Sequence, residues 1–110
     1  MRKAVVIGFD ESIEVIDLDA EEGSLKVLQD AVDGWVQVVD LAPTLSIWVN
    51  EEGKLEGLPY NSIATAIYQD RFGKVDIIVG NAVLTGGTDD EGDTIGLTDE
   101  QVSRIEKLFA

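Results

Sequence analysis

The sequence contains no histidine and no cysteine, and only 8 of its 110 residues are lysine or arginine. Histidine is the side chain whose unperturbed pKa lies nearest neutrality, and with cysteine it supplies most nucleophile–base pairs and most transition-metal sites. A chain without either residue is poorly equipped for these kinds of catalysis and metal binding. We therefore expect a binding protein and not an enzyme, with no cofactor and no metal.

Long apolar runs are also absent. No run approaches the ~20 residues that a helix needs to cross a bilayer. The apolar stretch that follows Met1, Arg2 and Lys3 covers only residues 4–7, which is too short for a signal peptide. No repeat, linker or low-complexity tract divides the chain. The sequence therefore predicts one domain over residues 1–110, located in the cytoplasm, where the absence of cysteine is in keeping with a reducing environment.

Acidic residues dominate the charge, with 22 aspartates and glutamates and a formal net charge of −14 at pH 7. Such a surface repels nucleic-acid phosphates and anionic membranes and favours a basic partner protein, although high solubility alone is the alternative explanation. Two stretches, residues 10–22 and 86–100, contain no lysine or arginine. They supply the acidic candidates for partner binding: Asp10, Glu11, Glu14, Asp17, Asp19, Glu21 and Glu22 in the first, and Asp89, Asp90, Glu91 and Asp93 in the second.

Short apolar or alternating runs predict strands over residues 4–7, 13–18, 35–41, 45–49 and 75–79, the last running on to residue 84 through a bulge. The clearest alternation is Leu45–Val49, whose buried face should hold Leu45, Ile47 and Val49, with Trp48 on the other face. An exposed Trp48 would be a hot spot for partner binding. A helix packed over that second face would instead bury it.

Helical spacing of apolar residues predicts three helices. Ser24 and Asn61 are the expected N-caps of the first two, and Thr98 with Gln101 forms a capping box at the start of the third. Gly34 is expected to end the first helix. The order strand, strand, helix, strand, strand, helix, strand, helix predicts a single α+β domain with a mixed, mostly antiparallel sheet of about five strands and three helices.

The acidic loop 89–93 has the composition of a calcium-binding segment, because hard cations prefer clustered oxygen ligands. The helix-loop-helix calcium pattern fails, since counting back from Gly92 as the sixth loop position places Gly87 at the first ligand position. Asp17 and Asp19 form the kind of carboxylate pair that glycosidases use, but acidic pairs are abundant here by composition alone. No residue is therefore assigned to catalysis, to a cofactor or to a metal.

Several motifs of turn, cap and strand residues run through the chain: Leu-Pro-Tyr-Asn at 58–61, Asp-Ile-Ile-Val-Gly at 76–80, Asp-Glu-Gly-Asp-Thr at 90–94 and Leu-Thr-Asp-Glu-Gln at 97–101. In these motifs the sequence resembles a small domain of unknown function that is encoded by bacteriophages, especially those of actinobacteria, and by plasmids. The resemblance covers most of the chain. It implies an accessory phage protein, and it supplies no catalytic residues.

Two functions follow from these observations. The first is a phage accessory protein that binds and modulates a basic host protein through its acidic surface, as an anti-defence factor or as a DNA mimic with carboxylates along an elongated face. The second is a small-molecule or nucleotide-binding domain, which would need basic residues to converge, namely Arg2, Lys3, Lys54, Arg71 and Lys74. We expect no direct binding to nucleic acid or membrane. A second copy of the chain is a further partner that the sequence allows.

Overall fold

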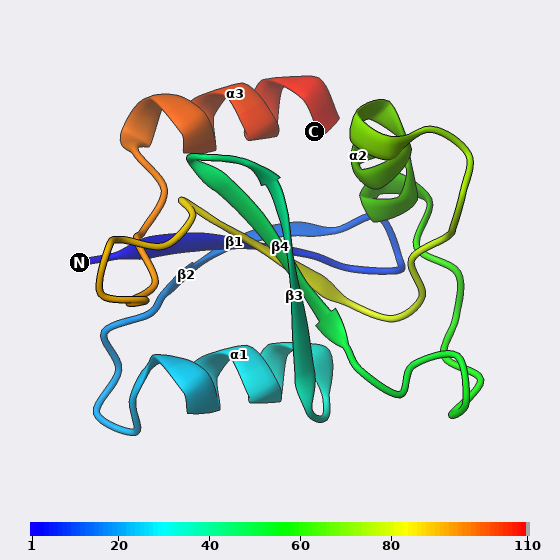
Figure 1. Ribbon diagram of the computed structural model, residues 1–110, viewed down its shortest axis with the longest axis horizontal. Coiled ribbons are helices and arrows are strands. Elements are labelled where there is room, and N and C mark those ends of the chain that lie inside the picture. Colours follow the sequence, from blue (N-terminus) through cyan, green and yellow to red (C-terminus); the bar gives the residue numbers. More distant parts are fainter. Residues whose placement is uncertain (110) are drawn as a thin grey trace.

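One antiparallel sheet lies between helices on both of its faces in the computed structural model, which describes residues 1–109 (Figure 1). The strands are β1 (Lys3–Ile7), β2 (Ile13–Asp17), β3 (Val36–Ala42), β4 (Leu45–Asn50) and β5 (Ala82–Thr85). Their order across the sheet is β2-β1-β5-β4-β3, and every pairing is antiparallel. The helices are α1 (Ser24–Val32), α2 (Ser62–Phe72) and α3 (Asp99–Phe109). The prediction of a single α+β domain with about five strands and three helices is confirmed.

The two faces of the sheet carry separate cores because successive side chains of a strand point to opposite sides. Helices α2 and α3 cover one face, and α1 covers the other (Figure 1). The core under α2 and α3 is built around Val5, Ile7, Ile47, Leu84 and Ile105. The core under α1 is built around Ala4, Leu18, Leu28, Val32 and Val83. A sheet that is buried on both faces leaves its two outer strands, β2 and β3, as its open edges.

Trp48 lies on the α1 face, opposite Ile47, as the alternation predicts. It is half-buried against the core under α1, and its indole Nε1 donates a hydrogen bond to the Thr85 hydroxyl (2.9 Å). Helix α1 therefore covers Trp48. This agrees with the expectation that a helix packed over this face buries Trp48, and not with the expectation of an exposed hot spot. The more exposed indole belongs to Trp35, whose side chain is 67% accessible.

The predicted strand over residues 75–79 is wrong. Only Val79 makes a β-bridge there, with Tyr60, and the strand begins later, at Ala82. The backbone of this segment bonds to side chains of α2 instead of to a neighbouring strand: Ile78 N–H donates to the Thr65 hydroxyl (2.9 Å), and the Gln69 amide donates to the Asp76 carbonyl (2.9 Å). Alternating residues in the sequence thus belong to a loop that α2 holds in place.

Of the predicted helix caps, two are confirmed and one is wrong. The Asn61 side chain accepts from Ala64 N–H (3.0 Å), and Thr98 and Gln101 exchange the two bonds of a capping box (2.9 and 3.1 Å). Ser24, however, is the first helical residue of α1. The N-cap is Gly23, which has a φ of 90° and makes no side-chain capping bond.

The end of α1 also differs from the prediction. Asp33, and not Gly34, adopts the left-handed conformation that closes the helix (φ 61°, ψ 45°). Aspartate tolerates this region better than most residues other than glycine and asparagine.

Within residues 1–109, no helix is both long enough and apolar enough to cross a membrane.

Candidate functional site

The first predicted acidic stretch is split between the two ends of the sheet. Asp10 and Glu11 lie in the turn between β1 and β2, whereas Asp19, Glu21 and Glu22 lie beyond the other end of β2. Strand β2 is five residues long, so at ~3.3 Å per residue its ends are roughly 17 Å apart. The remaining members, Glu14 and Asp17, are exposed on β2 itself. The stretch does not form one patch.

Two of these acids have local partners. The Asp10 carboxylate accepts from Ser12, whose side chain and backbone hydrogen bonds lower the pKa of Asp10 below its ordinary value. Asp19 accepts from the Arg2 guanidinium (2.6 Å) and from the Arg2 backbone N–H (2.7 Å), and these bonds lower the pKa of Asp19. The negative charge of Asp19 is therefore largely compensated within the molecule.

The second predicted stretch forms an exposed loop closed by a bridge between Thr88 and Thr94. The carboxylate of Asp89 accepts from the N–H groups of Glu91 and Asp93 (2.9 Å each), while Asp90 is exposed between them. The Arg2 side chain bonds both to the Thr94 carbonyl (2.9 Å) and to Asp19, so the loop lies beside the turn after β2. The turn that contains Asp19, Glu21 and Glu22 thus lies near the second stretch at one end of the sheet.

No three acidic side chains in the described part of the chain are placed to hold a metal ion. The basic residues named for a nucleotide site do not converge either. Four of the five have separate partners, Arg2 with Asp19, Lys3 with Asp99, Lys54 with Asp76 and Arg71 with the Leu41 carbonyl, and Lys74 is exposed.

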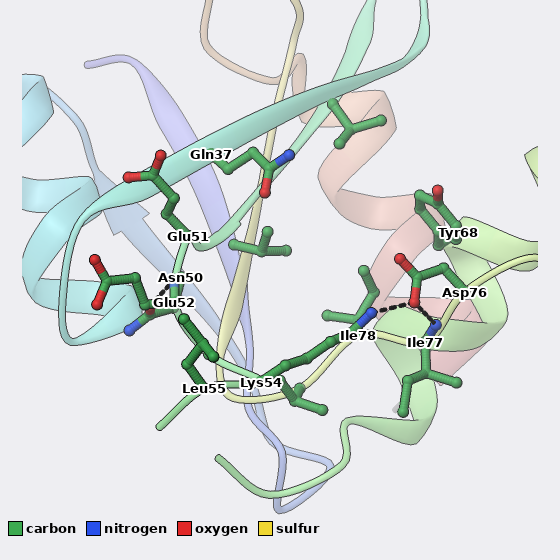
Figure 2. Close-up of a pocket in the computed structure, with 14 residues that line it drawn as sticks. Gln37, Asn50, Glu51, Glu52, Lys54, Leu55, Tyr68, Asp76, Ile77 and Ile78 are labelled. Atoms are coloured by element: carbon green, nitrogen blue, oxygen red, sulfur yellow. Dashed lines mark hydrogen bonds and ion pairs between the residues drawn. The ribbon is translucent and has the colours of Figure 1, made fainter. Parts of the chain in front are cut away.

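A hollow of about 190 Å³ opens beside edge strand β3, on the sheet face that carries α2 and α3 (Figure 2). It is lined on its apolar side by Val39, Val49, Leu55, Ile77, Ile78 and Val79, and on its polar side by Gln37, Asn50, Glu51, Glu52, Lys54, Tyr68 and Asp76. Figure 2 shows Glu51 and Glu52 on one side of the hollow and Tyr68 and Asp76 on the other, with Gln37 between them. The hollow combines an apolar lining with an acidic rim.

The charges at this rim are unbalanced. The Lys54 ammonium reaches across to Asp76 and forms an ion pair with it (Figure 2). This bond, together with the Ile77 N–H that donates to the same carboxylate (2.8 Å), lowers the pKa of Asp76 below its ordinary value of 3.8. Within residues 1–109, neither Glu51 nor Glu52 takes part in an ion pair. The rim therefore carries two acidic groups that no ion pair within the described residues neutralises.

The loop that carries Glu51 and Glu52 is held in position by Asn50. The buried Asn50 amide donates to the Val32 carbonyl at the end of α1 (3.2 Å), and its oxygen accepts from Glu52 N–H (2.8 Å). Gly53 packs so tightly that a Cβ there would lie 3.0 Å from Val79. These contacts fix the direction in which the two glutamates leave the surface.

Sequence reasoning did not find this site. Residues 50–54 have the composition of a turn, and the other lining residues are separated from them by long stretches of chain. The sequence does contain one signal of a structured turn here, because Asn50 precedes Glu51 and Glu52 and Gly53 follows them. An asparagine that can bond to its own backbone two residues on is typical of a structured turn.

A second, more apolar groove of about 570 Å³ lies between α2 and α3. Its lining includes Leu45, Ile67, Leu84, Ile105 and Leu108, and its charged lining residues are Asp70, Arg71 and Arg104. The guanidinium of Arg71 donates to the Leu41 carbonyl (2.8 Å), and that of Arg104 lies 3.4 Å from Glu100. Two arginines therefore line this apolar groove.

Comparisons with known proteins add a family and no activity. No curated protein and no solved structure matches the chain. A family described as "Domain of unknown function (DUF3846)" matches residues 1–110. The match covers the entire sequence, and the chain therefore belongs to the DUF3846 family.

Proposed function

We propose that this chain is a protein-binding module, a phage accessory protein whose acidic surface engages a basic protein of the host cell. The single observation that supports the binding site is the acid-rimmed hollow beside β3. Glu51 and Glu52 are exposed there without ion-pair partners among the described residues, and apolar side chains line part of the hollow below them. The phage association rests on the sequence motifs alone.

The hollow suits a segment of protein better than a small polar ligand. Protein interfaces combine an apolar centre with a polar rim, and complementary charges at the rim speed association and select the partner. Leu55 and Ile77 are 89% and 43% exposed beside the hollow, so they extend its apolar surface outward. A partner with lysine or arginine beside apolar side chains would match both features.

A partner that docks here is favoured over imitation of a DNA duplex. A mimic needs carboxylates along an elongated face, because B-DNA carries one charge per ~1.7 Å of its axis. The molecule measures 31 × 28 × 26 Å, and its first acidic stretch is divided between opposite ends of the sheet. We therefore propose docking through the rim of the hollow and not replacement of a duplex.

Calorimetric titration with a defined peptide tests the proposal. The probe is a seven-residue peptide with valine at positions 3 and 5 and lysine at the other five positions, capped at both ends, and its counterpart has glutamate in place of lysine. We expect the lysine peptide to bind, the glutamate peptide not to bind, and the affinity for the lysine peptide to fall as salt screens the charges. Absence of binding by the lysine peptide would contradict the proposal.

Matched variants locate the binding. The double variant Glu51→Gln with Glu52→Gln should weaken binding about threefold to tenfold, since exposed ion pairs are worth ~0.2–1 kcal/mol each. The control, Asp89→Asn with Asp90→Asn, changes the net charge by the same amount at a site away from the hollow. If both double variants weaken binding equally, the overall charge and not this rim attracts the peptide.

The groove between α2 and α3 favours a second candidate function, the binding of a small ligand. Its apolar lining and its two arginines suit an apolar group that bears a carboxylate or a phosphate. Medium-chain fatty acids and nucleotides are the probes, and thermal unfolding is the readout. A rise in Tm of several degrees that Arg104→Gln removes would support this function. If no probe raises the Tm, this second candidate function is wrong.

A further inference from the structure

We infer that the partner binds as an extended strand that pairs with the outer edge of β3 and places an apolar side chain in the hollow. This inference rests on the proposed function, and it specifies the conformation and chemistry of the partner. Strand β3 is the last strand of the sheet on the side where the hollow opens. An edge strand offers a row of free backbone groups that an extended peptide can pair with.

The backbone groups that face outward follow from the ladder between β3 and β4. Glu51 N–H donates to the Trp35 carbonyl (2.8 Å), which makes these two residues a hydrogen-bonded pair. Hydrogen-bonded pairs alternate with non-bonded pairs along an antiparallel ladder, so Gln37 and Val39 also point their N–H and C=O groups toward β4. The groups of Val36, Val38 and Asp40 therefore point to the open edge.

The Asp40 side chain supports this assignment. Asp40 lies opposite Ser46, and the Ser46 hydroxyl donates to its carboxylate (2.7 Å). Side chains approach most closely in non-hydrogen-bonded pairs, and the alternation predicts that Asp40 and Ser46 form such a pair. The bond also turns the only charge of β3 toward β4, so that charge does not extend over the edge.

The two edges of the sheet differ in the features that prevent strand pairing. Edge strands are usually protected by short length, by lysine, by proline or by other charges. Strand β2 has five residues and carries Glu14 and Asp17. Strand β3 has seven residues with neither lysine nor proline, and Val38 is 42% exposed on it. Only the register shift near Asp40 interrupts its far end.

The occupant is a basic strand of another protein and not a second copy of this chain. Two copies would each bring a net charge of −14 and two rim glutamates to the same place. An added strand that carries lysine or arginine brings the opposite charge to Glu51 and Glu52. Its side chains on the hollow side lie next to Gln37 and Val39, so an apolar residue at that position enters the hollow.

Hydrogen exchange with the lysine–valine peptide tests the inference. At saturating peptide, we expect exchange at the outward amides of Val36, Val38 and Asp40 to slow at least tenfold, with the inward amides of Gln37 and Val39 changing much less. If the peptide binds and the outward amides exchange at their free rate, strand pairing is wrong and the proposed function stands. If the peptide does not bind, both are wrong.

A variant pair provides the second readout. Val38→Pro removes an outward N–H and leaves the ladder with β4 intact, since proline is tolerated where the missing donor faces solvent. Val38→Thr keeps the N–H and a similar shape. We expect the proline variant to bind the peptide at least tenfold more weakly and the threonine variant to bind within twofold of the wild type. Equal binding by the two variants would overturn the inference. It would also be overturned if, without peptide, the outward amides became more protected from exchange as the protein concentration rises. That result would assign the edge of β3 to a second copy of the chain.

Discussion

Asn61 joins three parts of the fold through one buried side chain. Its oxygen caps α2 by accepting from Ala64 N–H, and its amide donates to the carbonyls of Ile7 (2.9 Å) and Gly80 (2.8 Å). The residue is fully buried. The cap was predictable from the sequence, because asparagine before a helical run is a standard signal. The two long-range bonds were not predictable from the sequence, because they depend on the positions of β1 and of the loop after α2 in the folded protein.

Replacing Asn61 with alanine should therefore cost more than the loss of a cap. A lost cap costs ~1 kcal/mol, and leaving the carbonyls of Ile7 and Gly80 without a donor adds ~1–3 kcal/mol. We expect Asn61→Ala to lower the free energy of unfolding by about 3 kcal/mol, measured by urea denaturation. The exposed neighbour Ser62 provides the control, Ser62→Ala, which should change it by less than ~0.5 kcal/mol. Equal effects would show that the Asn61 network contributes little.

The ion pair between Lys54 and Asp76 predicts a pH dependence of stability. Because the pKa of Asp76 in the folded state lies below its ordinary value of 3.8, the pair stabilises the fold above that pH. This contribution is lost as the pH falls through the folded-state pKa. Both side chains are about half exposed, so the effect is no more than ~1 kcal/mol.

The variant Asp76→Asn isolates this effect. Thermal unfolding should show the wild type more stable than the variant at pH 6, with the difference vanishing near pH 2. Asparagine keeps an oxygen that can accept from Ile77 N–H, so the comparison reports the charge. A difference that stays constant over this pH range would rule out the ion pair as its cause.

At the scale of elements, sequence patterns succeeded where local rules decide the outcome. The alternation in β4 and the capping box of α3 depend on neighbours within a few residues, and both were predicted. Residues 75–79 also show an alternating pattern, yet Thr65 and Gln69 of α2 take their backbone groups. The hollow escaped prediction for the same reason, because β3, β4, α2 and two loops contribute to its lining.

The capping box gives a prediction for α3. Thr98 accepts from Gln101 N–H (3.1 Å), and the Gln101 side chain also donates to the Thr44 carbonyl (2.9 Å) near the end of β3. Thr98→Ala should lower the free energy of unfolding by ~1 kcal/mol in urea denaturation. Thr98→Ser keeps the hydroxyl and should stay within ~0.5 kcal/mol of the wild type. A serine variant as unstable as the alanine variant would mean that the threonine methyl, and not the cap, matters.

At the scale of the whole molecule, the charge of −14 acts on folding and on binding in opposite ways. Like charges repel within the folded protein, and salt shortens the screening length from ~30 Å at 0.01 M to ~3 Å at 1 M. The free energy of unfolding should therefore rise by about 1 kcal/mol over this range, a rise in Tm of ~4–8 °C. Over the same range, affinity for a basic peptide should fall. A Tm that drops with added salt would show that the ion pairs outweigh the repulsion.

The most direct test of the central claim is a map of backbone amide chemical shifts recorded during titration with the lysine–valine peptide. The hollow beside β3 is one surface, and the acidic end formed by residues 17–22 and 89–93 is another. We predict that the largest shift changes fall at residues 36–40, 51–55 and 76–78. Largest changes at residues 17–22 and 89–93, with the hollow unaffected, would contradict the account.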